Sequence, residues 1–471
     1  MTDRSAAAAA AVLVTMALSI GASPCAAQTD AGDPPLEHTT LVYPPYAHTL
    51  GIHRARPVHL ALFLGDRARF DDPQGVAAVK FASSDDPDAK GDDFQLTLFG
   101  VNSGRGEVLY NSSMQTLAVY GEEGDGEGRF RSPHGIAATV DGRIYLADTG
   151  NRRVARLRWD SIARALEWAG AWPAGEPFDV ATDARGQVYV TDRAANAVLR
   201  FADSAAGAGT GFLAPSPISA DRWPLAEDAR ALLGLAVGDS LDPWYHPSAY
   251  RLYLVDLDGA RLRAYGLDGA VLAEVTAAEI PGPGSGSGGF DYVALDYYGN
   301  VYVTDTGAGV LYKFDPDLRH LTTFPGPGPA DEALEEPRGI AIWRRFGQVF
   351  VAEREGAQYF FLGTDFRTAE PVAVRRAGEP RQYGFDLFLT EGAIVTASFM
   401  DAGGDTLAVA EAGVYGTGDQ AIAWGPKAWA RPPPDGWEER AVSLQIEARP
   451  TYSSRKRFSL KRTFSIVWTD S

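Results

Sequence analysis

Six positions along the chain carry side chains that could recognise a ligand. Each stands between a Pro-like and a Gly-like position at the start of a short apolar stretch. The six residues are Gln74, His134, Phe178, Leu233, Asp291 and Arg338. This mixture of polar, charged and apolar groups predicts a small binding pocket, because such pockets combine apolar walls with a few convergent polar groups. A mutual ion pair between Asp291 and Arg338 is the alternative to a role in binding.

Catalytic and metal-binding residues are poorly represented in this set. A zinc site needs three or four ligands, yet His134 is the only histidine among the six residues. His246 and His320 lie outside these six positions. A calcium site would draw on carboxylates and amides, of which Asp291 and Gln74 are the candidates. The sequence also lacks a Gly-x-Ser-x-Gly elbow, an HExxH pair and a phosphate loop. We therefore predict no catalytic residue, no metal and no cofactor.

A second set of polar residues recurs at a fixed register. In each copy an aromatic residue stands three positions before an acidic or amide residue, and an apolar residue follows the polar one by six. The polar residues are Asn102, Asp148, Asp192, Asp256, Asp305 and Glu353. A carboxylate at a strand end commonly accepts backbone N–H groups of the next turn. Because the residue type recurs in every copy, we predict a structural role and no ring of metal ligands.

The repeated unit determines the elements that position both sets. Each copy holds an inner strand, a turn with Gly and Asp, a strand around the aromatic residue, a tight turn and a third strand. Connecting stretches such as residues 164–169 have the length and alternation for a fourth. One four-stranded unit cannot bury both faces, so the copies are expected to stack until a ring closes. The predicted class is all-β.

The unit resembles the NHL repeat, whose signature is a Pro-x-Gly-Ile-Ala start, an Asp-Gly turn, a Tyr-Val-Ala-Asp strand and an Asn-x-x-Val return. Residues 130–157 match it best, and the resemblance extends from Phe70 to about Asp365. It implies a six-bladed β-propeller whose inner strands begin at the channel mouth. NHL-type enzymes similar to peptidylglycine amidating lyase place several metal-binding histidines there, whereas this chain offers only His134.

Two segments compete to close the ring. Residues 57–64 precede the first blade and are expected to add a strand to the last one, whereas residues 371–376 follow the last blade. These choices place a flexible N-terminal segment at 28–56 and the propeller at 57–376. Insertions before Phe94 and around Trp244 make the first and fourth blades the least regular.

Residues 380–471 are expected to form a second, smaller β domain. They resemble the FlgD-like immunoglobulin-type domain in the stretch that opens at Leu389, in the Asp401–Gly404 turn and in the strand that ends at Trp424. The resemblance implies an Ig-like β-sandwich that serves as a spacer, adhesion or sorting element. The alternative is that this domain only stabilises the end of the propeller.

The N-terminus has the features of a secretory signal peptide. Arg4 precedes an apolar stretch from Ala6 to Ile20, and small residues surround a cleavage site after Ala27. An uncleaved anchor is the alternative, although the stretch is shorter than the roughly 20 residues of a spanning helix. Cys25 is the single cysteine and would permit a lipoprotein, but Pro24 departs from the usual lipobox. We predict a secreted or periplasmic protein.

The charge balance restricts the partners. The formal net charge is −18, so nucleic acid and anionic membrane surfaces are poor partners, since phosphate binding needs clustered Lys and Arg. The basic run at 455–457 is interpreted as a solvated strand face. The predicted function is a binding scaffold for a protein, peptide or glycan. The alternative is a metal-dependent propeller enzyme, a lyase or a lactonase-like hydrolase, with its site at the central channel.

Overall fold

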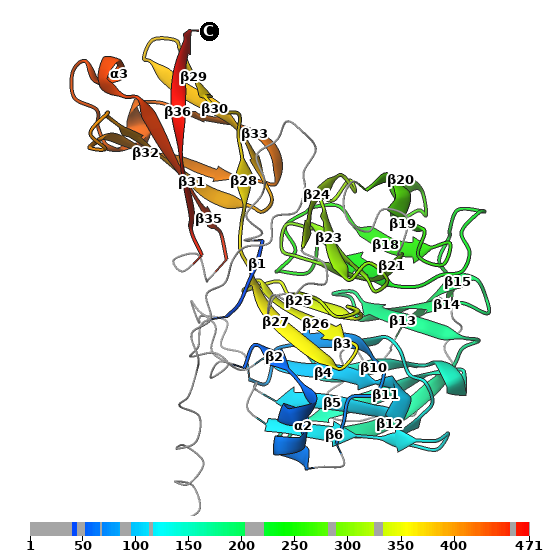
Figure 1. Cartoon of the computed structure of the whole chain (residues 1–471). Coiled ribbons are helices and arrows are strands. Elements are labelled where there is room, and N and C mark those ends of the chain that lie inside the picture. The colour runs from blue at the N-terminus through cyan, green and yellow to red at the C-terminus, as the bar shows by residue number, and fades with distance from the viewer. Residues whose placement is uncertain are drawn as a thin grey trace, which may run out of the picture.

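The computed structural model describes residues 40–44, 52–65, 68–84, 96–112, 116–202, 221–280, 289–324, 333–452 and 458–470 (Figure 1). The signal peptide, Cys25 and the basic run at 455–457 lie outside these residues. No helix within the described part of the chain is long and apolar enough to cross a membrane.

Six β-sheets form the blades of a propeller, which confirms the predicted all-β ring of six units (Figure 1). Neighbouring strands in each blade are antiparallel and follow one another along the chain. Blade one contains β3 (Pro73–Val79), β4 (Thr97–Asn102), β5 (Glu107–Ser112) and β6 (Thr116–Tyr120). Blade two contains β9 (Ile136–Ala138), β10 (Arg143–Asp148), β11 (Arg153–Asp160) and β12 (Ala165–Pro173). Blade three contains β13 (Pro177–Thr182), β14 (Gln187–Asp192), β15 (Ala197–Ala202) and β16 (Asp221–Arg222).

The other three blades repeat this order. Blade four contains β17 (Leu235–Gly238), β18 (Arg251–Asp256), β19 (Arg261–Tyr265) and β20 (Val271–Thr276). Blade five contains β21 (Phe290–Leu295), β22 (Val301–Asp305), β23 (Val310–Phe314) and β24 (His320–Phe324). Blade six contains β25 (Ile340–Trp343), β26 (Gln348–Glu353) and β27 (Gly356–Leu362). The short strands β7 (Glu122–Glu123) and β8 (Arg129–Phe130) and the 3-10 turn η3 (Ala277–Glu279) lie between blades. The 3-10 turns η1 (Ser103–Arg105) and η2 (Thr149–Asn151) join the second and third strands of blades one and two.

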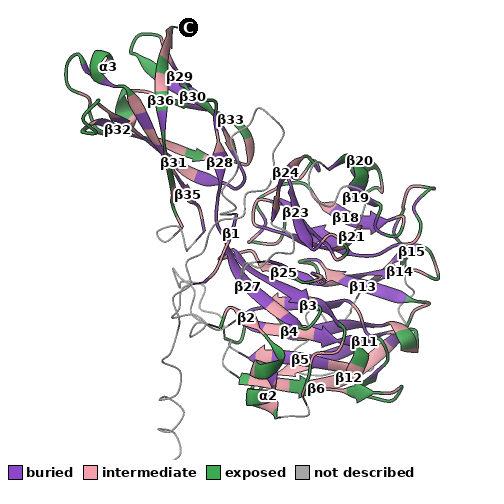
Figure 2. Ribbon diagram, viewed as in Figure 1, coloured by how far each residue is buried: buried purple, intermediate pink, exposed green. Residues whose placement is uncertain are grey.

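The hydrophobic core lies between neighbouring blades. The second strands of blades two to six are buried along nearly their whole length, as Figure 2 shows for β18, and therefore read as nearly continuous apolar runs. Tyr145, Tyr253 and Tyr302 at the repeated aromatic position are at most 1% exposed. The inner strands contact one another around the ring, and β3 of the first blade contacts β25 of the last.

The ring is closed by the N-terminal segment, but through different residues from those predicted. β1 (Leu41–Val42) and β2 (Arg54–Ala55) both pair with β27 and complete blade six. The predicted clasp at 57–64 is wrong, because Pro57–Leu64 forms the helix α2. Pro at the first turn and a capping contact from the Arg56 N–H to Nδ1 of His59 favour this helix. Strand β2, directly before it, already occupies the edge of β27.

The competing clasp at 371–376 is also wrong. These residues lie mainly in β29 (Val372–Ala377), which pairs with β30 (Gln382–Leu389) and β36 (Leu460–Asp470) in the C-terminal unit. β28 (Phe366–Arg367) pairs with β30 as well. The structural transition therefore comes directly after β27, earlier than the predicted boundary at 376.

The C-terminal unit is a nine-stranded β structure with a hydrophobic core of its own. Its long last strand joins two groups, because the first half of β36 pairs antiparallel with β35 and the second half pairs parallel with β29. The remaining elements are β31 (Ala393–Met400), β32 (Thr406–Tyr415), β33 (Gly418–Trp424), η4 (Pro426–Ala428), β34 (Trp429–Arg431), α3 (Trp437–Arg440) and β35 (Ser443–Pro450).

A buried polar contact joins this unit to blade five. Nζ of Lys313 lies 2.5 Å from Oε2 of Glu391 and 4.0 Å from Oδ2 of Asp296. Tyr302 donates to the same Glu391 oxygen, and the Tyr298 hydroxyl lies 2.6 Å from Oγ1 of Thr451. Burial, followed by the charge of Glu391, raises the pKa of Asp296 well above its usual range.

Candidate functional site

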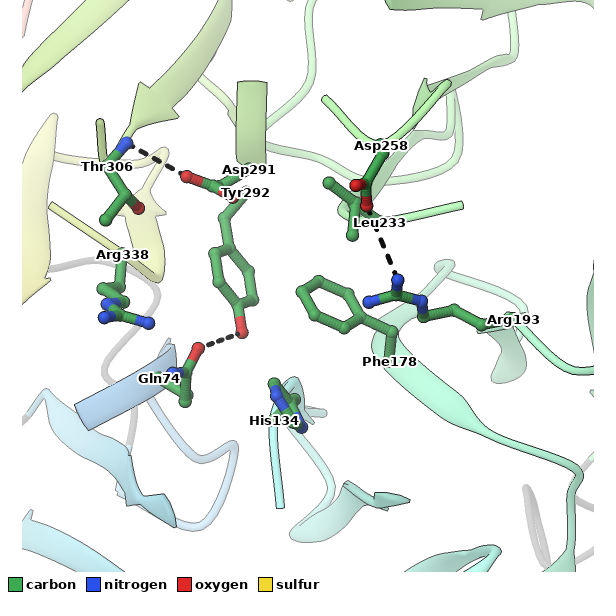
Figure 3. A pocket seen from close by; sticks show the side chains of 10 residues that line it. All are labelled: Gln74, His134, Phe178, Arg193, Leu233, Asp258, Asp291, Tyr292, Thr306 and Arg338. Carbon is green, nitrogen blue, oxygen red and sulfur yellow. Dashed lines mark hydrogen bonds and ion pairs between the residues drawn. The ribbon is translucent and has the colours of Figure 1, made fainter. Parts of the chain in front are cut away.

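A cavity of about 320 Å³ lies at the end of the ring where the inner strands begin (Figure 3). All six residues that the sequence analysis selected line it, one from each blade. Ten residues line it in total: Gln74, His134, Phe178, Arg193, Leu233, Asp258, Asp291, Tyr292, Thr306 and Arg338. The C-terminal unit contacts the turn at 296–300, at the opposite end of the blade-five strands. The cavity therefore faces away from that contact.

Close approach of the inner strands brings these side chains together. The glycine after a site residue donates its backbone N–H to the carbonyl of the site residue in a neighbouring blade. The bonds run from Gly75 to His134 (3.1 Å), from Gly135 to Phe178 (2.8 Å) and from Gly234 to Asp291 (2.9 Å). A Cβ on Gly75 would lie 2.6 Å from the His134 oxygen, so only glycine fits. The glycine of the Pro-x-Gly pattern is therefore needed where two inner strands touch. The residue x directly before it lies at the mouth.

Blades three and five depart from this pattern. Asp179 stands at the glycine position of blade three, where its two carboxylate oxygens accept the N–H groups of Val180 (2.9 Å) and Leu235 (3.0 Å). Burial raises the pKa of Asp179 to about 7. Tyr292 occupies the same position in blade five and extends across the cavity toward blade one (Figure 3). One structural carboxylate and one cavity-lining ring therefore replace two glycines.

Three rings form one wall of the cavity. The ring of Phe178 lies 4.9 Å from that of His134 and 5.5 Å from that of Tyr292, between centroids. The Tyr292 hydroxyl donates to Oε1 of Gln74 at 3.0 Å, and Gln74 donates to Asp72 at 2.9 Å. Because each ring touches a neighbour and Tyr292 is tethered, the wall is held in a defined position before any ligand arrives.

The hydrogen bonds around His134 determine its tautomer. Nδ1 lies 2.9 Å from the Ser132 carbonyl oxygen and 2.9 Å from Oγ1 of Thr149. The Thr149 hydroxyl donates its hydrogen bond to the Pro177 carbonyl oxygen at 2.6 Å. Both neighbours of Nδ1 are therefore acceptors. Nδ1 therefore carries the proton, and Nε2 presents a lone pair. Burial lowers the pKa of His134, which keeps the ring neutral near pH 7.

The charged groups of the cavity are balanced in pairs. Arg338 lies 3.4 Å from a carboxylate oxygen of Asp72, and Arg193 lies 3.5 Å from one of Asp258. The expected pair between Asp291 and Arg338 is not the one formed. Asp291 instead accepts the Thr306 N–H at 3.0 Å, and burial raises the pKa of its carboxyl. Each arginine of the cavity thus faces a carboxylate, and Asp291 is a lining carboxyl outside these pairs.

Four of the lining residues were not predicted. Tyr292 occupies a glycine position, whereas Arg193 and Thr306 directly follow the repeated acids of their blades and Asp258 follows two residues after its own. The turn between the second and third strands ends at the same face as the start of the inner strand. The residue after each repeated acid could therefore have been added to the candidates from the sequence.

The repeated acids themselves are buried in the turns. Asp192 accepts the N–H groups of Gly175 (2.6 Å), Glu176 (3.0 Å) and Ala195 (3.0 Å). Asp148 and Glu353 each accept one hydrogen bond from a backbone N–H. Each also accepts hydrogen bonding from an arginine, which is Arg153 for Asp148 and Arg54 for Glu353. Asp305 accepts the N–H of Ala308, and the two carboxylate oxygens of Asp256 accept hydrogen bonds from Arg261. None of these carboxylates lines the cavity.

Metal ligands do not gather at the mouth or elsewhere in the described residues, where no three His, Cys, Asp or Glu side chains form a group that could hold an ion. A second hollow of about 730 Å³ lies in the C-terminal unit beside β28, β30 and β33. Its wall includes Arg367, whose guanidinium lies 4.0 Å from the Phe388 ring centroid. Its lining comes from β28 and the residues after it, β30 and β33, so it lacks the convergence from six blades seen at the mouth.

Sequence comparison identifies an NHL repeat at residues 130–157. NHL repeat-containing protein 3 from Homo sapiens is 38% identical over 65 residues, which are 14% of this chain and 18% of that protein. Its Mus musculus counterpart is 34% identical over the same length, with the same shares. The match thus spans about a fifth of these curated relatives. The chain contains an NHL repeat within a six-bladed propeller.

Solved propeller structures are similar at a lower level. Virginiamycin B lyase from Staphylococcus aureus has 13% identity and a TM-score of 0.37, covering 56% of this chain and 77% of that one. A streptogramin B lyase structure has 15% identity and a TM-score of 0.41, covering 63% and 95%. Identities and TM-scores this low do not indicate the activity of this chain.

Proposed function

We propose that this chain is an exported propeller scaffold that binds a ligand in the cavity at its channel mouth. The supporting observation is the convergence of six unlike side chains, one from each blade, on a single cavity. The repeated positions of the blades carry similar residues, whereas the mouth positions differ from blade to blade. A structural ring alone does not require this difference. The predicted signal peptide supports an extracytoplasmic site of action, and the C-terminal unit serves as an Ig-like spacer, adhesion or sorting element of the FlgD-like type.

A metal-dependent lyase or hydrolase is the second candidate. One observation favours it: Nε2 of His134 is a free acceptor in the cavity, as a metal ligand or general base would be. The absence of further ligands among the described residues near it weighs against this alternative.

A combined metal analysis and ligand screen tests the proposal. The purified protein is expected to carry no stoichiometric zinc or calcium, and chelation is expected to leave its melting temperature unchanged. A ligand that binds only the folded state at a hundred times its Kd stabilises it by about 2.7 kcal/mol, which a thermal-shift screen detects. The proposal predicts that such a shift disappears in Phe178→Ala. One metal ion per chain, lost together with activity in His134→Ala, would support the enzyme instead.

A further inference from the structure

We propose that the ligand of the mouth cavity is a compact, uncharged polyhydroxylated ring, such as one pyranose unit of a glycan. This inference rests on the proposed binding function and specifies its ligand. It follows from four features of the cavity, namely its charge balance, its size, its backbone and the placement of its hydrogen-bonding atoms.

The charge balance favours an uncharged ligand. Both arginines of the cavity already face a carboxylate, Arg193 at Asp258 and Arg338 at Asp72. An anionic ligand would have to compete with those carboxylates. A cationic ligand would have to compete with the arginines for Asp72 or Asp258, or with the Thr306 N–H for Asp291. A neutral molecule with hydroxyl groups needs neither exchange, because an arginine N–H that faces the cavity can donate to a hydroxyl oxygen while the ion pair persists.

The size and the backbone of the rim favour a compact ligand over an extended peptide. The volume of about 320 Å³ lies at the lower end of the roughly 300–1,000 Å³ of small-molecule sites. An extended peptide gains affinity by pairing with a free strand edge. At this rim the N–H groups of His134, Leu233 and Arg338 are already bonded to carbonyls of their own blades, at 2.8–2.9 Å. The rim thus offers mainly side chains.

The hydrogen-bonding atoms complement a hydroxylated ring. Nε2 of His134 and the second oxygen of the Asp291 carboxylate are acceptors, and the Tyr292 oxygen can also accept because its proton goes to Gln74. Arg338 supplies donors. A hydroxyl group is both a donor and an acceptor, so one class of ligand group satisfies both kinds of atom.

The aromatic wall complements the apolar face of such a ring. Phe178 lies between His134 and Tyr292, with Leu233 beside it (Figure 3). A pyranose has C–H groups on its faces and hydroxyls around its edge. Seated against this wall, it would direct its hydroxyl groups toward Nε2 of His134, toward Asp291 and toward Arg338.

Calorimetric titration with defined probes tests this assignment. The sugar probes are the methyl glycosides of glucose, galactose, mannose and N-acetylglucosamine. Succinate and glycylglycine represent the anionic and peptide classes. We expect saturable binding of at least one methyl glycoside and none of succinate or glycylglycine. Phe178→Ala is expected to abolish binding, and His134→Phe, which keeps a ring but removes the acceptor, to weaken it roughly two- to tenfold.

A matched control excludes a general effect of losing a histidine. His246 is exposed in the turn between β17 and β18, at the opposite end of the strands. His246→Phe is expected to bind the sugar like the parent, and circular dichroism verifies that each variant is folded.

The outcomes separate this assignment from the proposed function. Binding of succinate or glycylglycine that disappears in Phe178→Ala would overturn the sugar assignment and leave the binding function standing. Sugar binding that is unchanged in both Phe178→Ala and His134→Phe would place the sugar elsewhere and overturn the assignment. If no probe binds the parent, the sugar assignment is wrong; if the thermal-shift screen also yields no ligand sensitive to Phe178→Ala, the binding function fails with it.

Discussion

Removing one partner of the buried Lys313–Glu391 pair is expected to destabilise the protein strongly. The side chains of Lys313 and Glu391 are 2% and 0% exposed, and they connect blade five to the C-terminal unit. A buried ion pair that loses one member leaves an uncompensated charge, which costs about 3–5 kcal/mol. Lys313→Met is therefore expected to lower the free energy of unfolding by this amount. The double change Lys313→Met with Glu391→Leu is expected to recover most of it, because no lone charge remains.

The assay is a double-mutant cycle in urea, followed by tryptophan fluorescence and far-ultraviolet circular dichroism. A control comes from Arg375 and Asp386, which lie 2.8 Å apart but are 34% and 76% exposed. Pairs of this kind contribute about 0–1 kcal/mol, so Arg375→Met is expected to have little effect. A cost of Lys313→Met no larger than that of Arg375→Met would contradict the expected role of the buried pair, and so would a double variant that is less stable than both single variants.

Four further outcomes are expected. Asp192→Ala should cost about 1–3 kcal/mol in chemical denaturation, because it leaves the N–H donors of the turn without their acceptor; a loss below about 0.5 kcal/mol would contradict this. Leu41→Ala, at a 2% exposed site in the closing strand, should cost about 2–5 kcal/mol, whereas Leu62→Ala at a 74% exposed site of α2 should change stability by less than about 0.5 kcal/mol; equal costs would disprove closure by β1. The pKa of Asp179 is raised to about 7, so its contribution to stability is present below pH 4 and is lost as the pH rises toward 7; Asp179→Asn should remove that part of the slope whatever its absolute stability, and an unchanged slope would refute the assignment. The exported protein should begin near Gln28 in mass spectrometry, and recovery of the full-length chain from the cytoplasm would contradict export.

The register of the repeat was sufficient to predict the blades. An aromatic residue and an acid at fixed spacing require the same strand and turn in each copy, so Tyr145 and Asp148 located the second strand directly. The ends of the ring were harder to predict. Residues 57–64 are apolar enough for either a strand or a helix, and short apolar runs do not distinguish the two. Pairing of residues 41–42 and 54–55 with β27 depends on an edge that only the assembled ring provides.

The sequence predicted six of the ten residues that line the cavity, because the repeat fixes their position. The mouth residues share one sequence position, and the repeat places that position at one end of every inner strand. Tyr292 was missed because it replaces a glycine, and Arg193 because it belongs to a turn that approaches the mouth only in three dimensions. The ion-pair partner of Arg338 could not be predicted from the sequence either. Arg338 belongs to the last blade and Asp72 directly precedes the first, so the two meet only when the ring closes.

A crystal structure of the protein with the strongest ligand from the screen would show directly whether the ligand binds at the channel mouth. We expect ligand density there, with the ligand against Phe178 and within hydrogen-bonding distance of His134 Nε2 or Arg338. Density confined to the hollow beside Arg367 in the C-terminal unit, with an empty mouth, would contradict it.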